Sequence, residues 1–163
     1  MSKNNFFSAF VVVLLGVLLL SACSENDCSL GGRPSARFNF IDAESKKQVS
    51  LFDSLTITSI GTDSILLNRA KSINHVTLPL NYIATETTYI LKYNRELHDT
   101  IWLKHKNIPH FISMDCGVDM FYEIDSVGYT KHGLDSIVLR NADINDTEKE
   151  NFQIYYTTKS SAN

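Results

Sequence analysis

Five histidines are the residues of this chain best suited to acid–base or metal chemistry, namely His75, His98, His105, His110 and His132. No two of them have the His-x-x-x-His spacing of zinc ligands on one helical face, and no His-Glu-x-x-His motif occurs. We therefore expect solvated loop histidines. The alternative is a small envelope hydrolase that uses a divalent cation at His98, His105 and the acidic loops.

Other catalytic patterns are also missing from the sequence. No Gly-x-Ser-x-Gly elbow and no Gly-rich phosphate loop occurs. Asp143–Thr147 starts like a calcium loop, but Glu148 replaces the required Gly and Ile154 the bidentate Glu. We predict no EF-hand, although a looser calcium site in this acidic loop remains an alternative. The sequence thus predicts no catalytic residue, no cofactor and no metal ligand.

Trp102 is a candidate binding residue. Strand alternation places it with Lys104 and Lys106, on the face opposite Ile101 and Leu103. An exposed Trp flanked by lysines could stack on a sugar ring or on a partner's side chain. We favour the other interpretation, in which both faces of the strand are covered and Trp102 belongs to the core.

The start of the chain predicts export. Lys3 precedes an apolar run, Phe6–Leu20, whose length of about 15 residues is short for a membrane span of about 20. The run ends in Leu20-Ser21-Ala22-Cys23, which resembles the lipobox of bacterial lipoproteins. That resemblance implies a signal peptide over 1–22 and a lipid-modified Cys23 that stays on its membrane. An ordinary cleaved signal is the alternative.

The charge of the remaining chain bears on partners and location. Loss of Lys3 leaves 14 basic against 18 acidic residues, a net charge of −4 without any basic run. This balance argues against nucleic acid and leaves an envelope protein or glycan as the expected partner. Ser24-Glu25-Asn26-Asp27 partly resembles the acidic export tag of surface-displayed lipoproteins of Bacteroidota. We expect the protein to be anchored in the outer membrane, on either its periplasmic or its surface face.

Two further cysteines, Cys28 and Cys116, make an even pair once Cys23 carries lipid. In an oxidising compartment such a pair predicts a structural disulfide before a metal site or a nucleophile. Two free thiols remain the alternative, because the sequence cannot show that the sulfurs meet.

From residue 36 onward the apolar residues recur with period two. We expect a lipidated tether over 23–35, flexible around Gly31-Gly32, and one domain over 36–158. The domain is predicted to be an all-β antiparallel β-sandwich, immunoglobulin-like or similar, with seven to nine strands. Pro109 is expected to interrupt a central strand. The clearest strands are 36–40, 55–57, 87–93, 99–105, 118–124 and 152–156, with 64–67, 76–78 and 137–139 as additions.

Several short motifs spread over the mature chain together carry a family resemblance. They include Leu78-Pro79-Leu80-Asn81, Asp115-Cys116-Gly117 and the ending Asn151-Phe152-Gln153-Ile154-Tyr155-Tyr156. The chain resembles an uncharacterised family of small Bacteroidota lipoproteins, a domain of unknown function. This resemblance implies the anchor, the cysteine pair and the β domain, but no activity.

Asp followed by Ser or Thr and then an aliphatic residue recurs in the domain. The pattern resembles the O-glycosylation sequon of exported Bacteroidota proteins, and it is also what a turn followed by a strand produces. The candidate sites are Ser54, Ser64, Thr100, Ser126 and Ser136.

Overall fold

A computed structural model describes residues 33–157, except 52–53, 62–63, 115 and 148. The described part of the chain contains no helix that is long and apolar enough to cross a membrane. Its strands are β1 (Ser35–Asp42), β2 (Leu55–Ser59), β3 (Ile65–Ala70), β4 (His75–Pro79), β5 (Glu86–Lys92), β6 (His98–Ser113), β7 (Gly117–Tyr129), β8 (Ser136–Leu139), β9 (Asp143–Ile144) and β10 (Phe152–Tyr156).

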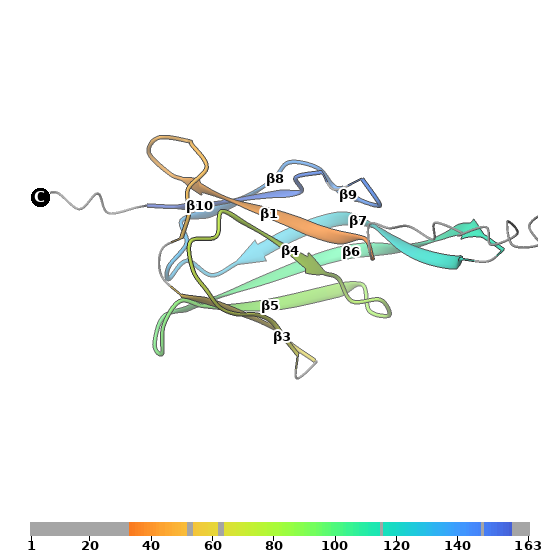
Figure 1. Cartoon of the computed structure of the whole chain (residues 1–163), viewed down its shortest axis with the longest axis horizontal. Helices are drawn as coiled ribbons and strands as arrows, with labels where there is room; N and C mark the ends of the chain where they lie inside the picture. The colour runs from red at the N-terminus through yellow and green to blue at the C-terminus, as the bar shows by residue number, and fades with distance from the viewer. Residues whose placement is uncertain (1–32, 52–53, 62–63, 115, 148, 158–163) are drawn as a thin grey trace, which may run out of the picture.

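These strands form two sheets that lie over one another (Figure 1). One sheet has the order β4-β1-β10-β8 and the other the order β3-β2-β5-β6-β7-β9. Every pair of neighbours is antiparallel except β1 and β10, which run parallel. The predicted all-β, mostly antiparallel sandwich is therefore confirmed.

Phe38 lies at the centre of the core between the sheets. It is fully buried, and its ring stacks on Phe152 of the parallel neighbour with centroids 4.6 Å apart. Its ring also meets Tyr89 of the opposite sheet edge to face, at 6.1 Å and 84°. Period-two alternation produces this arrangement, because Ala36, Phe38 and Phe40 all point to the same face of β1. One side chain thus connects both sheets.

β6 is longer than expected, because it runs through Pro109 to Ser113. The prediction that Pro109 interrupts the strand is wrong. β5 begins at Glu86, opposite Lys104, so the part of β6 beyond Lys104 pairs with β7 alone, where Pro109 lies opposite Met120. A proline is tolerated where its missing N–H would face an open edge.

β9 is a strand that the sequence analysis placed in a loop. Ile144 and Asp143 pair with Tyr122 and Glu123 of β7, and Ile144 is buried. The described residues therefore form ten strands, whereas seven to nine were expected. A strand of two residues is too short to show a period in the sequence.

The signal peptide over 1–22, Cys23 and Cys28 lie outside the described residues, and these predictions stay untested. The described chain starts at Arg33, and β1 begins at Ser35, one residue before the predicted start of the domain.

Phe38→Ala should lower the free energy of unfolding by about 3–5 kcal/mol, because it leaves a cavity where the two sheets meet. Phe111→Ala is the matched control, since the Phe111 side chain is exposed, and should change stability by about 0.5 kcal/mol or less. Urea unfolding of both variants measures the difference. Equal losses would contradict this placement of the core.

Candidate functional site

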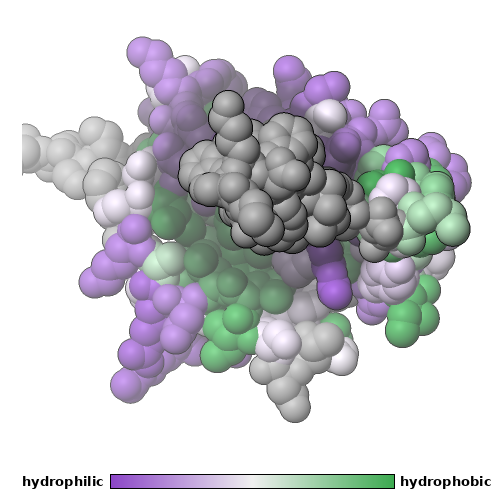
Figure 2. Space-filling model, turned by 45° about the vertical axis from the view of Figure 1, so that its right-hand side comes forward, coloured by the Kyte–Doolittle hydropathy of each residue, from purple (hydrophilic) through white to green (hydrophobic). Residues whose placement is uncertain are grey.

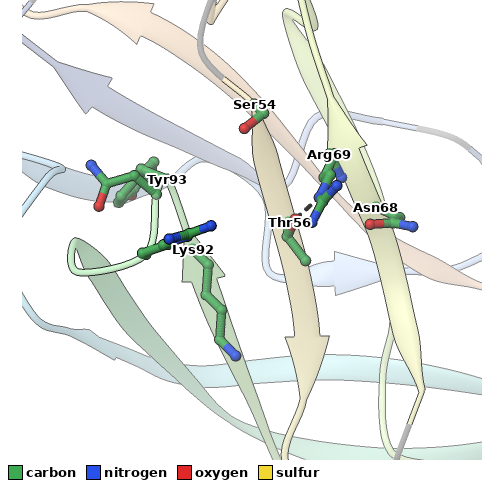
Figure 3. A pocket seen from close by; sticks show the side chains of 8 residues that line it. Ser54, Thr56, Asn68, Arg69, Lys92 and Tyr93 are labelled. Carbon is green, nitrogen blue, oxygen red and sulfur yellow. Dashed lines mark hydrogen bonds between the residues drawn. The ribbon is translucent and has the colours of Figure 1, made fainter.

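A hollow of about 330 Å³ lies on the six-stranded sheet, at the end where β5 turns into β6 (Figure 3). Its lining comes from β2, β3, β5 and the β5–β6 turn. The lining residues are Ser54, Thr56, Asn68, Arg69, Lys92, Tyr93, Asn94 and Arg95. We call this hollow the basic groove.

A β-bulge directs Arg69 toward the basic groove. Leu55 pairs with Ala70 and Ile57 with Leu67, so Thr56 of β2 faces two residues of β3, Asn68 and Arg69. Arg69 has a φ of 46°, a backbone conformation that a non-glycine residue adopts at a cost on the order of 1 kcal/mol. Its backbone N–H donates to Thr56 Oγ1 at 3.2 Å (Figure 3). Bulges and strained residues of this kind gather at functional sites.

The groove carries positive charge without a matching acid in its lining. Arg69, Lys92 and Arg95 are exposed, and none of the eight lining residues is Asp or Glu. None of the ion pairs between described residues involves these three cations. Hydroxyl and amide groups complete the lining, so the groove is suited to an anionic, hydrogen-bonding ligand.

The turn that presents Arg95 is shaped by the neighbouring asparagine. Asn94 Oδ1 accepts hydrogen bonds from the backbone N–H groups of Glu96 and Leu97, at 2.9 and 2.7 Å. Asn commonly stabilises turns in this way. The position of Arg95 therefore depends on a local contact that the sequence itself encodes.

A buried carboxylate lies next to this end of the six-stranded sheet. Asp99 is fully buried at the start of β6. Oδ1 accepts from Thr130 Oγ1 and the His132 N–H, both at 2.7 Å. Oδ2 accepts from the N–H groups of Gly133 and Leu134, at 2.7 and 2.9 Å. One side chain thus orders the loop that joins β7 to β8.

These bonds determine the charge state of Asp99. Burial is the largest single influence and raises the pKa of the carboxyl, but the hydrogen bonds from His132, Thr130, Gly133 and Leu134 together outweigh it. The pKa of Asp99 is therefore below its usual 3.8, and the group is an anion at neutral pH.

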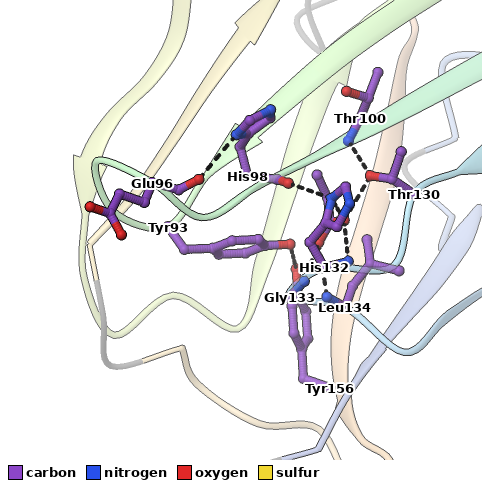
Figure 4. A network of polar contacts seen from close by, with 10 residues as sticks. Tyr93, Glu96, His98, Thr100, Thr130, His132, Gly133, Leu134 and Tyr156 are labelled. Atoms are coloured by element: carbon purple, nitrogen blue, oxygen red, sulfur yellow. Dashed lines mark hydrogen bonds and ion pairs between the residues drawn. The ribbon is translucent and has the colours of Figure 1, made fainter.

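Tyr93 connects the basic groove to the core. Its hydroxyl lies 3.2 Å from the hydroxyl of Tyr156, and the two rings meet edge to face (Figure 4). Burial raises the pKa of both phenols, so both are neutral. The aromatic wall of the groove is therefore held from behind.

His105 forms a second buried polar contact, further along β6. Its Nε2 lies 2.8 Å from Thr87 Oγ1, and its Nδ1 lies 2.8 Å from Asn107 Oδ1. Asn107 Nδ2 donates to three backbone carbonyls, those of Asn81, Tyr82 and Ala84. The Asn107 oxygen is thus the acceptor, and His105 donates from Nδ1.

Burial lowers the pKa of His105, and its contact with Asn107 offsets only part of the effect. The imidazole is neutral at pH 7 and holds the 80–85 loop against β6.

The histidines do not assemble into a metal site. His98 is exposed at the start of β6 and His105 is buried seven residues later, about 24 Å along the strand. His110 stacks on Phe121 at 4.3 Å instead of approaching them. No group of three or more His, Cys, Asp or Glu that could hold a metal occurs between residues 33 and 157 where the structure describes them.

Trp102 is on the surface, so its placement in the core is wrong. It shares the outer face of β6 with Lys104 and is 38 % exposed. Its indole covers Gly128, the residue opposite it on β7, where an added Cβ would lie 1.9 Å from Trp102 Nε1. Cross-strand cover of a glycine accounts for the ring's position, and a role of Trp102 and Lys104 as a ligand platform stays a prediction.

The other predicted positions are spread over the molecule. Ser64 and Ser126 are exposed, while Thr100 and Ser136 are half-buried and Ser54 lines the basic groove. Asp99, which precedes Thr100, is fully buried and therefore inaccessible to a modifying enzyme in the folded chain. Cys116 lies beside the β6–β7 turn, where its N–H donates to Ser113 Oγ at 3.1 Å.

The sequence analysis missed an apolar surface at that same turn. Phe111, Met114 and Val118 are all exposed. The signal in the sequence was the alternation of apolar residues, which continues past Pro109. We missed it because we expected the strand to break at Pro109.

Asp99→Asn should lower the free energy of unfolding by about 3 kcal/mol at neutral pH, because an amide turns an NH₂ group toward two backbone donors. A carboxyl with a depressed folded pKa stabilises above its ordinary pKa, and this stabilisation is lost as the pH falls through the folded pKa. The difference from wild type should be full above pH 3.8 and shrink below it. Urea unfolding across this range measures it.

The control for this substitution is the exposed Asp135, whose carboxylate accepts a hydrogen bond from Thr157. Asp135→Asn should change stability by about 0.5 kcal/mol or less. If Asp99→Asn lowers the free energy of unfolding by no more than this, Asp99 does not stabilise the loop between β7 and β8 as described.

Comparison with known proteins gives a family but no activity. No curated protein and no solved structure matches the chain. An immunoglobulin-like relationship therefore stays untested. The model of a family of unknown function matches residues 54–156, from the edge of the basic groove to the end of β10. This match covers more than half of the sequence and agrees with the expected uncharacterised family, and the chain belongs to the family of unknown function DUF6452.

Proposed function

We propose that this chain is a non-catalytic binding module of the cell envelope, anchored by lipid at Cys23, whose basic groove takes an anionic sugar of an envelope glycan. The observation that carries the proposal is Arg69, which lies in a strained bulge and lines the same groove as Lys92 and Arg95.

The lining of the groove favours a glycan as the ligand. Its volume of about 330 Å³ is at the lower end of small-molecule sites and suits one sugar unit. Ser54, Thr56 and Asn68 supply groups that can bond sugar hydroxyls, and Tyr93 supplies a ring held by Tyr156. The cations can bind a carboxylate or phosphate on the sugar.

A binding role fits the described side chains better than a hydrolase does. An enzyme of the metal-dependent kind needs acids and bases that converge in one pocket, whereas His98 and His105 are far apart on β6 and no acid lines the groove. The family that matches is named for no activity.

The anchor rests on the lipobox of the sequence, and the outer membrane is the location we propose for it. The Cys28–Cys116 disulfide belongs to the same proposal. It is supported by the even number of cysteines that remain after lipidation.

The substitution Arg69→Gly should weaken ligand binding without lowering the stability of the fold. Glycine accepts a φ of 46° without strain, so the variant should be as stable as wild type, or up to about 1 kcal/mol more stable. Loss of the guanidinium should weaken binding of an oligogalacturonate roughly tenfold or more. Calorimetric titration measures binding, and a neutral galactan is the reference ligand.

Lys46→Gly is the matched control. Lys46 also has a positive φ, 58°, and its substitution by glycine also removes one positive charge. Lys46 does not line the basic groove. It should keep full affinity for the oligogalacturonate. Equal binding by Arg69→Gly and wild type, or equal binding of the neutral galactan, would refute the anionic-glycan site.

The two roles proposed for cysteines can be separated in the lipidated chain. Cys23→Ser should release the protein from the membrane fraction and leave its thermal unfolding unchanged. Cys116→Ser should stay attached and unfold at a lower temperature, since a bridge closing nearly ninety residues is worth on the order of 4 kcal/mol. Release of Cys116→Ser, or its unchanged unfolding under non-reducing conditions, would count against these assignments.

A further inference from the structure

In the outer part of the β6–β7 hairpin, residues 108–114 and 116–121, one face carries apolar side chains that become exposed toward the turn. We call this part of the hairpin the outer ribbon. Its Phe111 lies opposite Val118, and Pro109 lies opposite Met120. Alternation puts these four residues on the same face as His105 and Tyr122, which are buried in the sandwich.

The exposed fractions of these side chains show where the opposite sheet stops covering the hairpin. Met120 is 9 % exposed, whereas Val118 and Phe111 are 52 % and 59 % exposed. Met114, at the turn, is 90 % exposed. The core-facing side of the hairpin thus keeps its apolar residues after it has left the core, which is unusual for a surface in contact with water.

The outer ribbon lies at the end of the molecule where the tether enters the sandwich. Arg33 lines a hollow together with Asn81 and Tyr82, and the carbonyls of those two residues accept hydrogen bonds from Asn107, just before the outer ribbon. In Figure 1, β1 begins at the end toward which β6 and β7 extend. Figure 2 brings that end forward and shows hydrophobic residues gathered there beside hydrophilic ones.

The length of the chain brings this surface within reach of the anchor. Cys23 and Ser35 are twelve positions apart in the sequence, and that segment spans at most about 40 Å. The outer ribbon extends about 20 Å from Asn107 to Ser113. A membrane that holds Cys23 is therefore close enough for the turn at Met114 to touch it, and the tether raises the effective concentration of lipid at the turn.

We propose that the outer ribbon rests its apolar face in the surface of the membrane that holds the lipid anchor. This inference depends on the anchor of the proposed function. Residues 108–121 include no Lys or Arg and two acids, Asp115 and Asp119, so the contact relies on apolar side chains and draws no support from anionic lipid. A Cys28–Cys116 bond would fix Cys28 beside the turn, and the lipidated Cys23 is only five positions from Cys28 in the sequence.

The test uses the lipidated full chain in phosphatidylcholine vesicles, with Trp102→Phe as the background. Met114→Trp places the only tryptophan at the turn of the outer ribbon. Its emission should shift to the blue and be roughly halved by brominated lipid, since tryptophan settles in the membrane interface. Val138→Trp is the matched control, because Val138 is a partly exposed apolar residue on β8 of the other sheet. Its emission should not change.

Flotation of the same vesicles separates the two proposals. If the protein does not float, the anchor has failed. If it floats and the tryptophan at 114 stays unquenched, the inference about the outer ribbon is wrong while the anchor stands. Quenching that disappears in pure phosphatidylcholine and needs anionic lipid also overturns it, and so does shielding of residue 114 only by an added envelope protein.

Discussion

A β-strand sends alternate side chains to the same face whether or not another layer covers that face, and β6 shows the consequence over its whole length. Asp99, Ile101, Leu103 and His105 point inward and are buried. The same face continues to Phe111, beyond the reach of the four-stranded sheet, where it is exposed. One strand therefore connects a polar end, a packed middle and an apolar tip.

Two buried polar side chains, one at the start of β6 and one near its middle, fix that strand against neighbouring loops. Asp99 collects four donors from the segment that follows β7 and lies behind the basic groove. His105 and Asn107 hold the 80–85 loop beside the point where the tether enters. Buried polar groups are stabilising only when they are fully bonded, and no buried side-chain N or O atom of the described residues is without a partner. The start and the middle of β6 are therefore each held by fully bonded polar groups.

The alternation of apolar residues was sufficient to predict nine of the ten strands and the sandwich, because burial on one face leaves a strong period-two signal. It failed at Pro109, since the cost of a proline depends on whether a neighbouring strand lies on its N–H side. It also failed at Trp102, whose burial depends on Gly128 across the strand pair. The basic groove could not be predicted, because a bulge brings Arg69 next to residues of β2 and β5 that are distant in sequence.

The central claim is an orientation, in which the outer ribbon faces the membrane and the basic groove faces away from it. Neutron reflectometry on a supported bilayer that carries the lipidated protein tests this claim directly. An upright molecule should give a protein layer of about 50 Å, the length of the sixteen-residue β6. A layer of about half that thickness would mean that the sandwich lies flat on the membrane, and would contradict the account.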